Sequence, residues 1–151
     1  MRGFAAIGLY HPKDKANVGG TLRAAYVYGA QLVALEGVRN DALRHAANTS
    51  QAWRHIPTIT TDNLHSVIPF DCVPVAIELV DDAIPLPTFW HPQRAFYVFG
   101  PEDGSLGAPV LSWCKHKVMV PGRICMNLAA TVNVVLYSRM AQFYRIKEAA
   151  E

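Results

Sequence analysis

The stretch that decides the fold class is Phe4-Ala-Ala-Ile-Gly-Leu-Tyr10. No charged residue interrupts it, and it lacks the apolar–polar alternation of a strand with one face in water. This continuous pattern predicts a strand buried on both faces, as in a parallel sheet covered by helices. Further strands are expected over Gln31–Leu35, Val73–Leu79, Arg94–Phe99 and Lys117–Val120, with a short edge strand over His55–Ile59.

Helical patterns separate these strands. Asn17 suits the N-cap of a helix that runs to about Tyr28, where Gly29 would end it. Residues 61–68 predict a short second helix. A C-terminal helix is expected from Leu128, because apolar residues recur on one face with a period of 3.6 residues. That face carries Val132, Val135, Leu136, Met140 and Phe143.

Length and composition agree with an α/β fold. A chain of 151 residues suits one domain, so we expect a single domain over residues 1–151, with a mostly parallel sheet flanked by helices. With 51% apolar and 17% charged residues, the composition excludes a disordered chain. No apolar run approaches the roughly 20 residues that cross a bilayer. The three cysteines lack metal-ligand spacing and no signal segment is evident, so we expect a cytoplasmic protein without a metal site.

Charge is unevenly distributed along the chain. Residues 1–54 carry seven Lys/Arg and three Asp/Glu, residues 55–93 carry five acids and no Lys/Arg, and residues 94–151 carry seven basic and four acidic residues. The three segments therefore have net charges of +4, −5 and +3, which sum to the overall +2. Such segregation is typical of a protein that faces a polyanion with one surface, although chance clustering explains it equally well.

Three segments place small or polar residues after a predicted strand, at the sheet edge where α/β proteins bind ligands. They are Asn17-Val-Gly-Gly-Thr-Leu-Arg23, Val98-Phe-Gly-Pro-Glu-Asp-Gly104 and Val120-Pro-Gly-Arg-Ile-Cys-Met-Asn-Leu128. Taken singly, each has a structural explanation: a capped helix with a surface arginine, a reverse turn, and a second helix cap. Taken together, they converge on one edge of the sheet.

In this order and at these separations, the segments resemble the motifs of the SpoU-type RNA 2′-O-ribose methyltransferases, which belong to the SPOUT trefoil-knot superfamily. The family's Asn-x-Gly-x-x-x-Arg motif corresponds to residues 17–23, and its Phe-Gly-x-Glu turn corresponds to residues 99–102. Its third motif, a strand ending in proline before an Asn-Leu pair, corresponds to Pro121 and Asn127-Leu128. The resemblance covers residues 4–145 and extends to the minimal enzymes that modify cytidine or uridine at the tRNA wobble position.

The resemblance implies an α/β trefoil knot in the C-terminal region, a homodimer, and tRNA or rRNA as substrate. It implies S-adenosylmethionine as methyl donor and S-adenosylhomocysteine as product. The residues matching the family's catalytic positions are Arg23, Asn17, Glu102 and Asn127. Those matching its cofactor pocket are Ile77, Glu78, Gly100, Val120, Cys125, Met126 and Leu128, of which Cys125 is expected to be a buried thiol.

Arg23 is the residue that the family pattern implicates most directly in the chemistry. Because a guanidinium group does not release its proton in proteins, Arg23 is expected to polarise the ribose hydroxyl through a neighbouring phosphate instead of removing its proton. In a homodimer, Arg23 of one subunit would face the cofactor of the other. Asn17, Glu102 and Asn127 would then position the ribose, the arginine and the third-motif loop.

Two other functions remain open. A catalytically inactive RNA-binding module on the same fold could stack bases on Trp53, Trp90 or Trp113, although single tryptophans more often lie in cores or interfaces. A nucleotide-dependent oxidoreductase could use the Gly19-Gly20 pair, with Glu36 as its ribose-binding acid. The oxidoreductase is disfavoured because the dinucleotide fingerprint requires three spaced glycines directly in the first turn.

Overall fold

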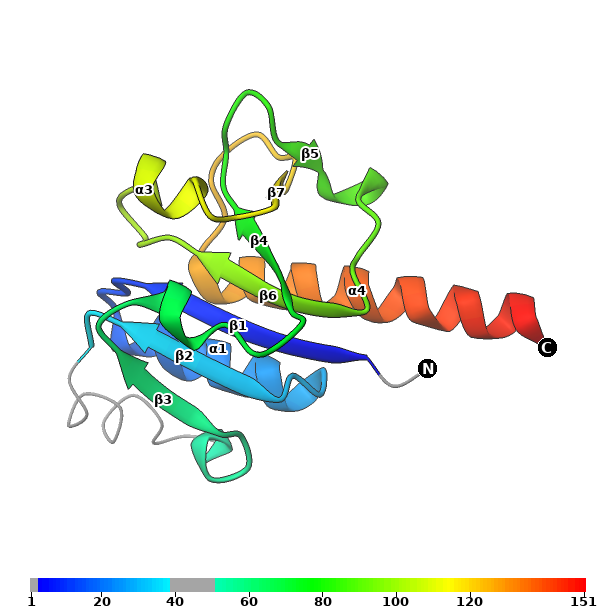
Figure 1. The fold of residues 1–151 in the computed structure, drawn as a ribbon, viewed down its shortest axis with the longest axis horizontal. Coiled ribbons are helices and arrows are strands. Elements are labelled where there is room, and N and C mark those ends of the chain that lie inside the picture. The colour runs from blue at the N-terminus through cyan, green and yellow to red at the C-terminus, as the bar shows by residue number, and fades with distance from the viewer. Residues whose placement is uncertain (1–2, 39–50) are drawn as a thin grey trace.

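The computed structural model describes residues 3–38 and 51–151, and within these residues one sheet organises the chain (Figure 1). Its strand order is β3-β2-β1-β6-β4-β7-β5, and every strand pairing is parallel. The strands are β1 (Phe4–Tyr10), β2 (Leu32–Glu36), β3 (Thr58–Thr61), β4 (Val73–Ile77), β5 (Ile84–Pro85), β6 (Arg94–Phe99) and β7 (His116–Met119). The prediction of a parallel α/β sheet flanked by helices is confirmed.

Helices cover both faces of this sheet. The longer helices, α1 (Lys15–Val27) and α4 (Leu128–Ala150), lie together on one face, whereas the short α3 (Gly107–Leu111) lies on the other (Figure 1). Three 3₁₀ turns connect the elements: η1 (Ala52–Arg54), η2 (Leu64–Val67) and η3 (Leu86–Thr88). Because successive side chains of a strand point to opposite faces, Ile7 joins the core beneath α1 and α4, and its neighbour Ala6 joins the core beneath η2 and α3.

The predicted and observed elements differ where segments are short. Residues 61–68 do not form the expected helix, because Thr61 ends β3 and only the single turn η2 follows. The side chain of Asn63 accepts the N–H of His65 and caps that turn. The edge strand expected from His55 begins at Thr58. Strand β5 and helix α3 have two and five residues, too few for a periodic pattern to reveal.

The α1 and α4 helices approach each other closely at Gly20. A Cβ atom placed on Gly20 would lie 2.7 Å from the Cβ of Ala129, which is nearer than side chains normally pack. The glycine therefore allows the two helix backbones to come together. This contact brings the second turn of α1 beside the first turn of α4.

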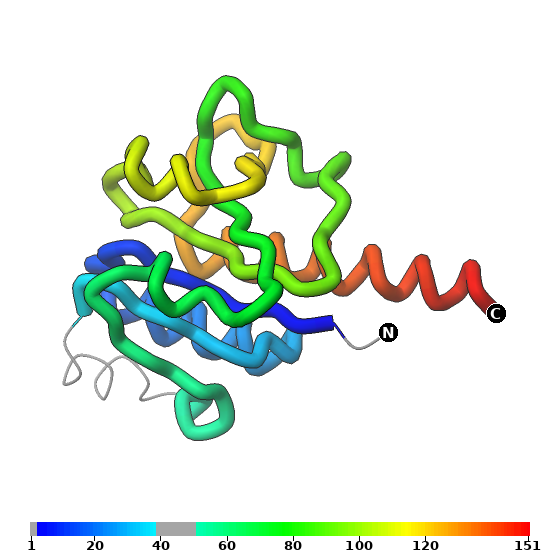
Figure 2. Tube along the Cα trace, in the orientation of Figure 1, coloured from blue at the N-terminus to red at the C-terminus, as the bar shows by residue number. Residues whose placement is uncertain are grey.

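Strand β7 lies between β4 and β5, both of which precede it in the chain. Residues 120–127 then lead from β7 to the start of α4, a course that can be followed in Figure 2. True knots are rare in protein chains, and the knotted C-terminal region implied by the family resemblance remains a prediction.

A buried polar network anchors the middle of α4. Arg139 is 7% exposed and donates hydrogen bonds to the carbonyl oxygens of Pro92 and Gln93. Beside it, Gln142 accepts the N–H of His91 at 2.7 Å and donates to the His91 carbonyl at 3.0 Å. The apolar face predicted for this helix is present, but polar side chains extend it and tie α4 to the segment that enters β6.

Candidate active site

The site begins with the cap of α1. Asp14 is the N-cap, because its side chain accepts the N–H of Ala16 at 2.8 Å and the helix starts at Lys15. The prediction that Asn17 caps this helix is therefore wrong. Asn17 lies in the first turn with 6% of its surface exposed, which frees its side-chain amide for contacts outside the helix.

The Asn17 amide joins the three motif segments. Its Nδ2 donates a hydrogen bond to Glu102 Oε1 at 3.0 Å, and its Oδ1 accepts one from Asn127 Nδ2 at 2.8 Å. Glu102 lies in the turn after β6, and Asn127 directly precedes α4. The structure thus places three of the four predicted catalytic residues in one hydrogen-bonded chain, which we call the Asn–Glu–Asn relay.

Glu102 is held by more than Asn17. Its Oε2 accepts the peptide N–H of Lys13 at 3.0 Å, and its Oε1 also accepts the N–H of Asp14 at 3.2 Å. Burial opposes ionisation of Glu102, but the hydrogen bonds from Lys13, Asn17 and Asp14 outweigh it and hold its pKa below the ordinary value. A carboxylate that is ionised and already engaged by donors is a poor base and a good positioning residue.

Asn127 has a second role as a helix cap. Its Oδ1 accepts the N–H of Ala130 at 3.2 Å, which confirms the cap expected at the start of α4. Because the oxygen serves the helix, the amide nitrogen is the atom available to Asn17. The positive end of the α4 dipole is thereby placed beside the relay.

An open groove with a volume of about 800 Å³ runs over the relay. An ion pair between Lys13 Nζ and Asp103 Oδ2, at 2.8 Å, lies at its exposed rim. The groove is lined by Lys13, Asp14, Lys15, Asn17, Glu102, Asp103, Met126, Asn127 and Leu128.

The predicted cofactor residues gather where three neighbouring strands end. In the strand register, Ile77 lies beside Phe99 on one side and Val118 on the other. Glu78 follows directly, and its Oε2 accepts the N–H of Leu106 at 2.8 Å, so this carboxylate ties the end of β4 to the loop after β6. Gly100 faces that loop, since a Cβ there would lie 3.3 Å from the Leu106 nitrogen.

The loop between β7 and α4 supplies the other predicted cofactor residues. Val120 packs against the core and Leu128 is 7% exposed, whereas Met126 is 41% exposed and lines the groove. Cys125 is exposed, so the expectation of a buried thiol is wrong. The reason is that residues 121–127 run along the surface as an irregular loop and do not enter the core.

With this geometry established, comparison with known proteins identifies the family. Residues 5–137 match the sequence model of the SpoU rRNA methylase family. The chain belongs to that family. A sequence search of curated proteins finds no match.

Solved structures of SpoU-family proteins share the fold. The SpoU methyltransferase AviRb from Streptomyces viridochromogenes, solved with AdoMet, superposes with a TM-score of 0.83 at 16% identity, over 96% of this chain and 62% of AviRb. An AdoMet-bound rRNA methyltransferase from Sinorhizobium meliloti superposes with a TM-score of 0.79 at 20% identity, and the match covers 94% of this chain and 57% of that enzyme. A structure concerned with 2-OH methylation of C/U34 on tRNA superposes with a TM-score of 0.77 at 21% identity. This match covers 94% of this chain and 92% of the other. The chain thus spans about three fifths of AviRb and nearly the whole of the third protein.

Arg23, the fourth predicted catalytic residue, lies apart from the relay in its own chain. It is exposed, whereas Asn17, six positions earlier on α1, is buried. Within the described part of the chain, no hydrogen bond or ion pair holds the guanidinium group. Arg23 therefore does not line the groove of its own chain.

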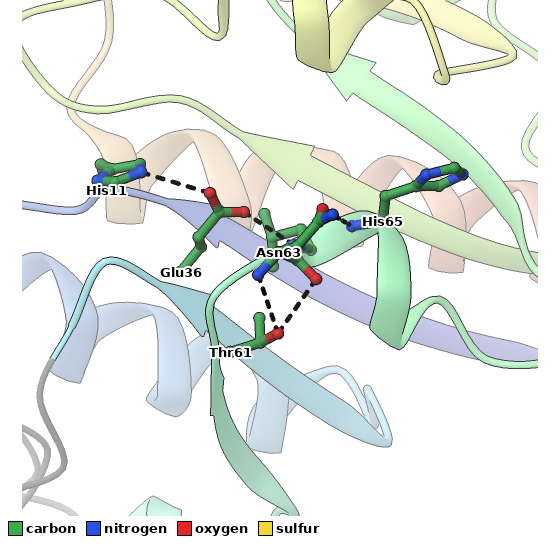
Figure 3. A network of polar contacts seen from close by, with 6 residues as sticks. His11, Glu36, Thr61, Asn63 and His65 are labelled. Carbon is green, nitrogen blue, oxygen red and sulfur yellow. Dashed lines mark hydrogen bonds and ion pairs between the residues drawn. The ribbon is translucent and has the colours of Figure 1, made fainter.

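Glu36 belongs to a separate structural network at the ends of β1 and β2 (Figure 3). Its Oε1 lies 3.4 Å from Nε2 of His11, and its Oε2 accepts the N–H of Leu64 at 2.8 Å. Asn63 and Thr61 bond to each other within the same turn. Oε2 of Glu36 holds η2 to the sheet and Oε1 faces His11 at the end of β1, so both oxygens are engaged and this carboxylate is not available as the ribose-binding acid of an oxidoreductase.

Two of the residues that hold Glu102 have no sequence signal. Lys13 and Asp14 act on it through backbone N–H groups, which every non-proline residue carries.

Among the described residues, no group of three or more His, Cys, Asp or Glu side chains has the arrangement of a metal site. No described helix combines the length and hydrophobicity needed to cross a membrane.

Proposed function

We propose that this SpoU-family chain transfers a methyl group from S-adenosylmethionine to a ribose 2′-hydroxyl of tRNA. The observation that carries the proposal is the Asn–Glu–Asn relay, which joins all three motif segments at one edge of the sheet. The choice of tRNA is supported by the structural neighbour concerned with C/U34 methylation, which matches this chain over 92% of its own length. The intact relay favours a catalyst over an inactive RNA-binding module.

The loops at this edge fit S-adenosylmethionine. An adenosine needs an apolar slot lined by backbone amides, and these loops expose apolar side chains that the core does not take up. Leu79 is 64% exposed after β4, and Ile124 and Met126 are 87% and 41% exposed after β7. The cofactor is held by Ile77, Glu78, Gly100, Val120, Cys125, Met126 and Leu128. When bound, it supplies an electrophilic methyl group on a positively charged sulfur.

Methyl transfer requires the ribose 2′-hydroxyl to lose its proton. A ribose hydroxyl does not ionise at neutral pH, so its proton must be eased away as the oxygen attacks. Glu102 is unsuited to take this proton because backbone and amide donors already occupy its oxygens. Arg23 polarises the hydroxyl through a neighbouring phosphate, and the relay fixes the ribose and the loop that precedes α4.

The active form is a homodimer. On α4, Tyr137 and Tyr144 are 57% and 64% exposed, and on α1, Val27 is 64% exposed. These side chains adjoin a cavity of about 560 Å³ that Tyr28 and Phe143 help to line. Large exposed apolar side chains on two neighbouring helices are typical of a subunit interface. Pairing of two copies through this surface supplies Arg23 to the site of the partner subunit.

The proposal is tested by Arg23→Ala. We expect methyl transfer from radiolabelled S-adenosylmethionine to total tRNA to fall by about 10²–10³-fold, the range typical of losing one group that stabilises the transition state electrostatically. Cofactor affinity, measured by calorimetry, should be nearly unchanged because Arg23 acts on the ribose hydroxyl and is not one of the residues that hold the cofactor. The matched control is Arg145→Ala, which removes another exposed arginine near the end of α4. Retained turnover in R23A, or transfer to a base instead of a ribose, contradicts the assignment.

A further inference from the structure

An exposed aromatic cluster lies on the side of α1 that faces η1. Tyr26 is 54% exposed, and its ring stacks on His55 with centroids 4.9 Å apart and planes 19° from parallel. Next to His55, the guanidinium carbon of Arg54 lies 5.2 Å from the ring centroid of Trp53, which is 41% exposed. One pair of rings is therefore already stacked at the surface, a guanidinium group lies over a second ring, and these side chains are not part of the core.

This cluster is close to Arg23. Tyr26 follows Arg23 by three residues, so the two side chains are neighbours on one helical face, about 4.5 Å apart along the axis. The opposite side of α1 packs on α4, where Gly20 approaches Ala129 and Tyr28 contacts Tyr137 edge-on. Arg23 thus lies between the apolar α1–α4 surface and the aromatic cluster.

The local charge favours a polyanion over a second copy of the chain. Helix α1 and residues 51–61 carry Lys15, Arg23 and Arg54 and no carboxylate. A second copy that docked here would have to bring carboxylates from elsewhere on its surface, whereas every nucleotide of an RNA strand carries a phosphate. An RNA strand offers phosphates to the arginines and flat bases to the rings.

We propose that Tyr26, Trp53, Arg54 and His55 form a stacking platform for an unpaired nucleotide that flanks the methylated ribose. The inference rests on the proposed function, since it assigns this nucleotide to the same RNA substrate. A strand whose phosphate engages Arg23 reaches Tyr26 within one helical turn, and the next base continues the stack formed by Tyr26 and His55. The platform would therefore select RNA that is single-stranded beside the target.

The test measures binding of fluorescein-labelled oligouridylate and of a blunt RNA duplex to the full-length protein. Trp53→Ala should weaken oligouridylate binding about tenfold, the loss expected from one stacked base, with little effect on the duplex. Trp53→Phe should restore most of the affinity, because a ring remains. The matched control is Trp90→Ala: Trp90 is 71% exposed but precedes β6, three strands away from the β3 that follows Trp53. Intrinsic fluorescence of the W90F/W113F protein, in which only Trp53 emits, should be quenched by oligouridylate.

Further outcomes separate this inference from the proposed function. If wild-type protein methylates tRNA and W53A does so equally at every RNA concentration, the platform is wrong while the function stands. If W53A raises the KM for tRNA and leaves kcat unchanged, the platform is supported. Quenching of Trp53 by oligouridylate without any methyl transfer supports the platform and contradicts the function. A change in sedimentation of W53A, with RNA binding unchanged, assigns the patch to a subunit interface and overturns the proposal.

Discussion

At the scale of the residue, Asn17 shows how much depends on which hydrogen bonds a side chain has left to make. The side-chain oxygen of an asparagine that caps a helix accepts a backbone N–H of the first turn, but in α1 Asp14 is the cap. Asn17 is therefore free to donate to Glu102 and accept from Asn127. The same side chain at the cap position would leave Glu102 and Asn127 unconnected.

His91 is the residue whose environment predicts a pH dependence of stability. It is 2% exposed, with one ring nitrogen 2.7 Å from the Tyr97 hydroxyl and the other 3.0 Å from the Ser138 hydroxyl. Burial, reinforced by the charge of Arg139, lowers the pKa of His91 from 6.5 to about 4. Between these values the unfolded chain binds a proton that the folded chain does not, so the free energy of unfolding decreases as pH falls below about 6.5.

We expect this loss to approach about 3 kcal/mol near pH 4, from about 1.4 kcal/mol per pKa unit. Urea unfolding at about pH 7 and about pH 5 measures it. This decrease in the free energy of unfolding should disappear in His91→Gln and persist in His65→Gln, which alters an exposed histidine. The lowered pKa of Glu102 removes stability only as pH falls through its ordinary value of 4.5 and below, so measurements at about pH 5 and above isolate the effect of His91. An H91Q protein with the pH dependence of the wild type contradicts the prediction.

At the scale of the element, α1 has a different neighbour on each side. Gly20 and Tyr28 face α4, and Tyr26 faces η1. Buried residues of α1, such as Leu22 and Ala25, pack on the sheet between them. The helix therefore sets the position of Asn17 at its first turn and of Arg23 on its exposed ridge through three separate contacts.

The contact at Gly20 predicts that a single methyl group destabilises the protein. Gly20→Ala improves helix propensity by about 1 kcal/mol, but the added Cβ meets Ala129 at 2.7 Å. Overpacking costs about 1–3 kcal/mol, so we expect a net loss of about 1 kcal/mol in the free energy of unfolding, together with reduced methyl transfer. Thermal and urea unfolding measure the stability, and Ala129→Gly in the same chain should recover it. A G20A protein more stable than the wild type shows that α1 and α4 are less tightly packed than described.

At the scale of the whole molecule, the groove of one chain does not include Arg23. The relay and the cofactor loops lie at the carboxyl edge of the sheet, but Arg23 lies outside the groove. Figure 1 shows the last turns of α4 extending past the sheet, and Tyr137 and Tyr144 on this helix are 57% and 64% exposed. The proposed dimer accounts for both features.

We expect the wild-type protein to sediment as a dimer and Tyr137→Glu to sediment as a monomer, because the substitution places a charge in the apolar surface formed by α1 and α4. Circular dichroism checks that the Y137E fold is retained. Mixing inactive R23A with inactive N17A should restore about a quarter of the wild-type methyl transfer, since half of the pairs are mixed and each mixed pair has one complete site. A fully active monomer, or the absence of any complementation, contradicts the shared site.

What the sequence determined by itself is local or ordered along the chain. Burial on both faces of Phe4–Tyr10, the period of α4, the Asn127 cap and the order of the three motifs all follow from residues close to one another, since strand and helix periods are short-range properties. Together these predicted the parallel sheet and the family. The sequence pattern did not predict the short elements β5 and α3, because two to five residues are too few to show a repeating pattern of apolar residues.

Only the tertiary structure decided which of these residues meet. Asn17 is 85 positions from Glu102 and 110 from Asn127, and their contact depends on β7 lying between β4 and β5 and on Gly20 letting α1 reach α4. The backbone N–H groups of Lys13 and Asp14, which stabilise the ionised form of Glu102, cannot be recognised from any side chain in the sequence. Long-range packing and backbone hydrogen bonds are properties of the folded chain, because any residue type can supply an N–H group and the close approach of distant segments is fixed only by the packed core.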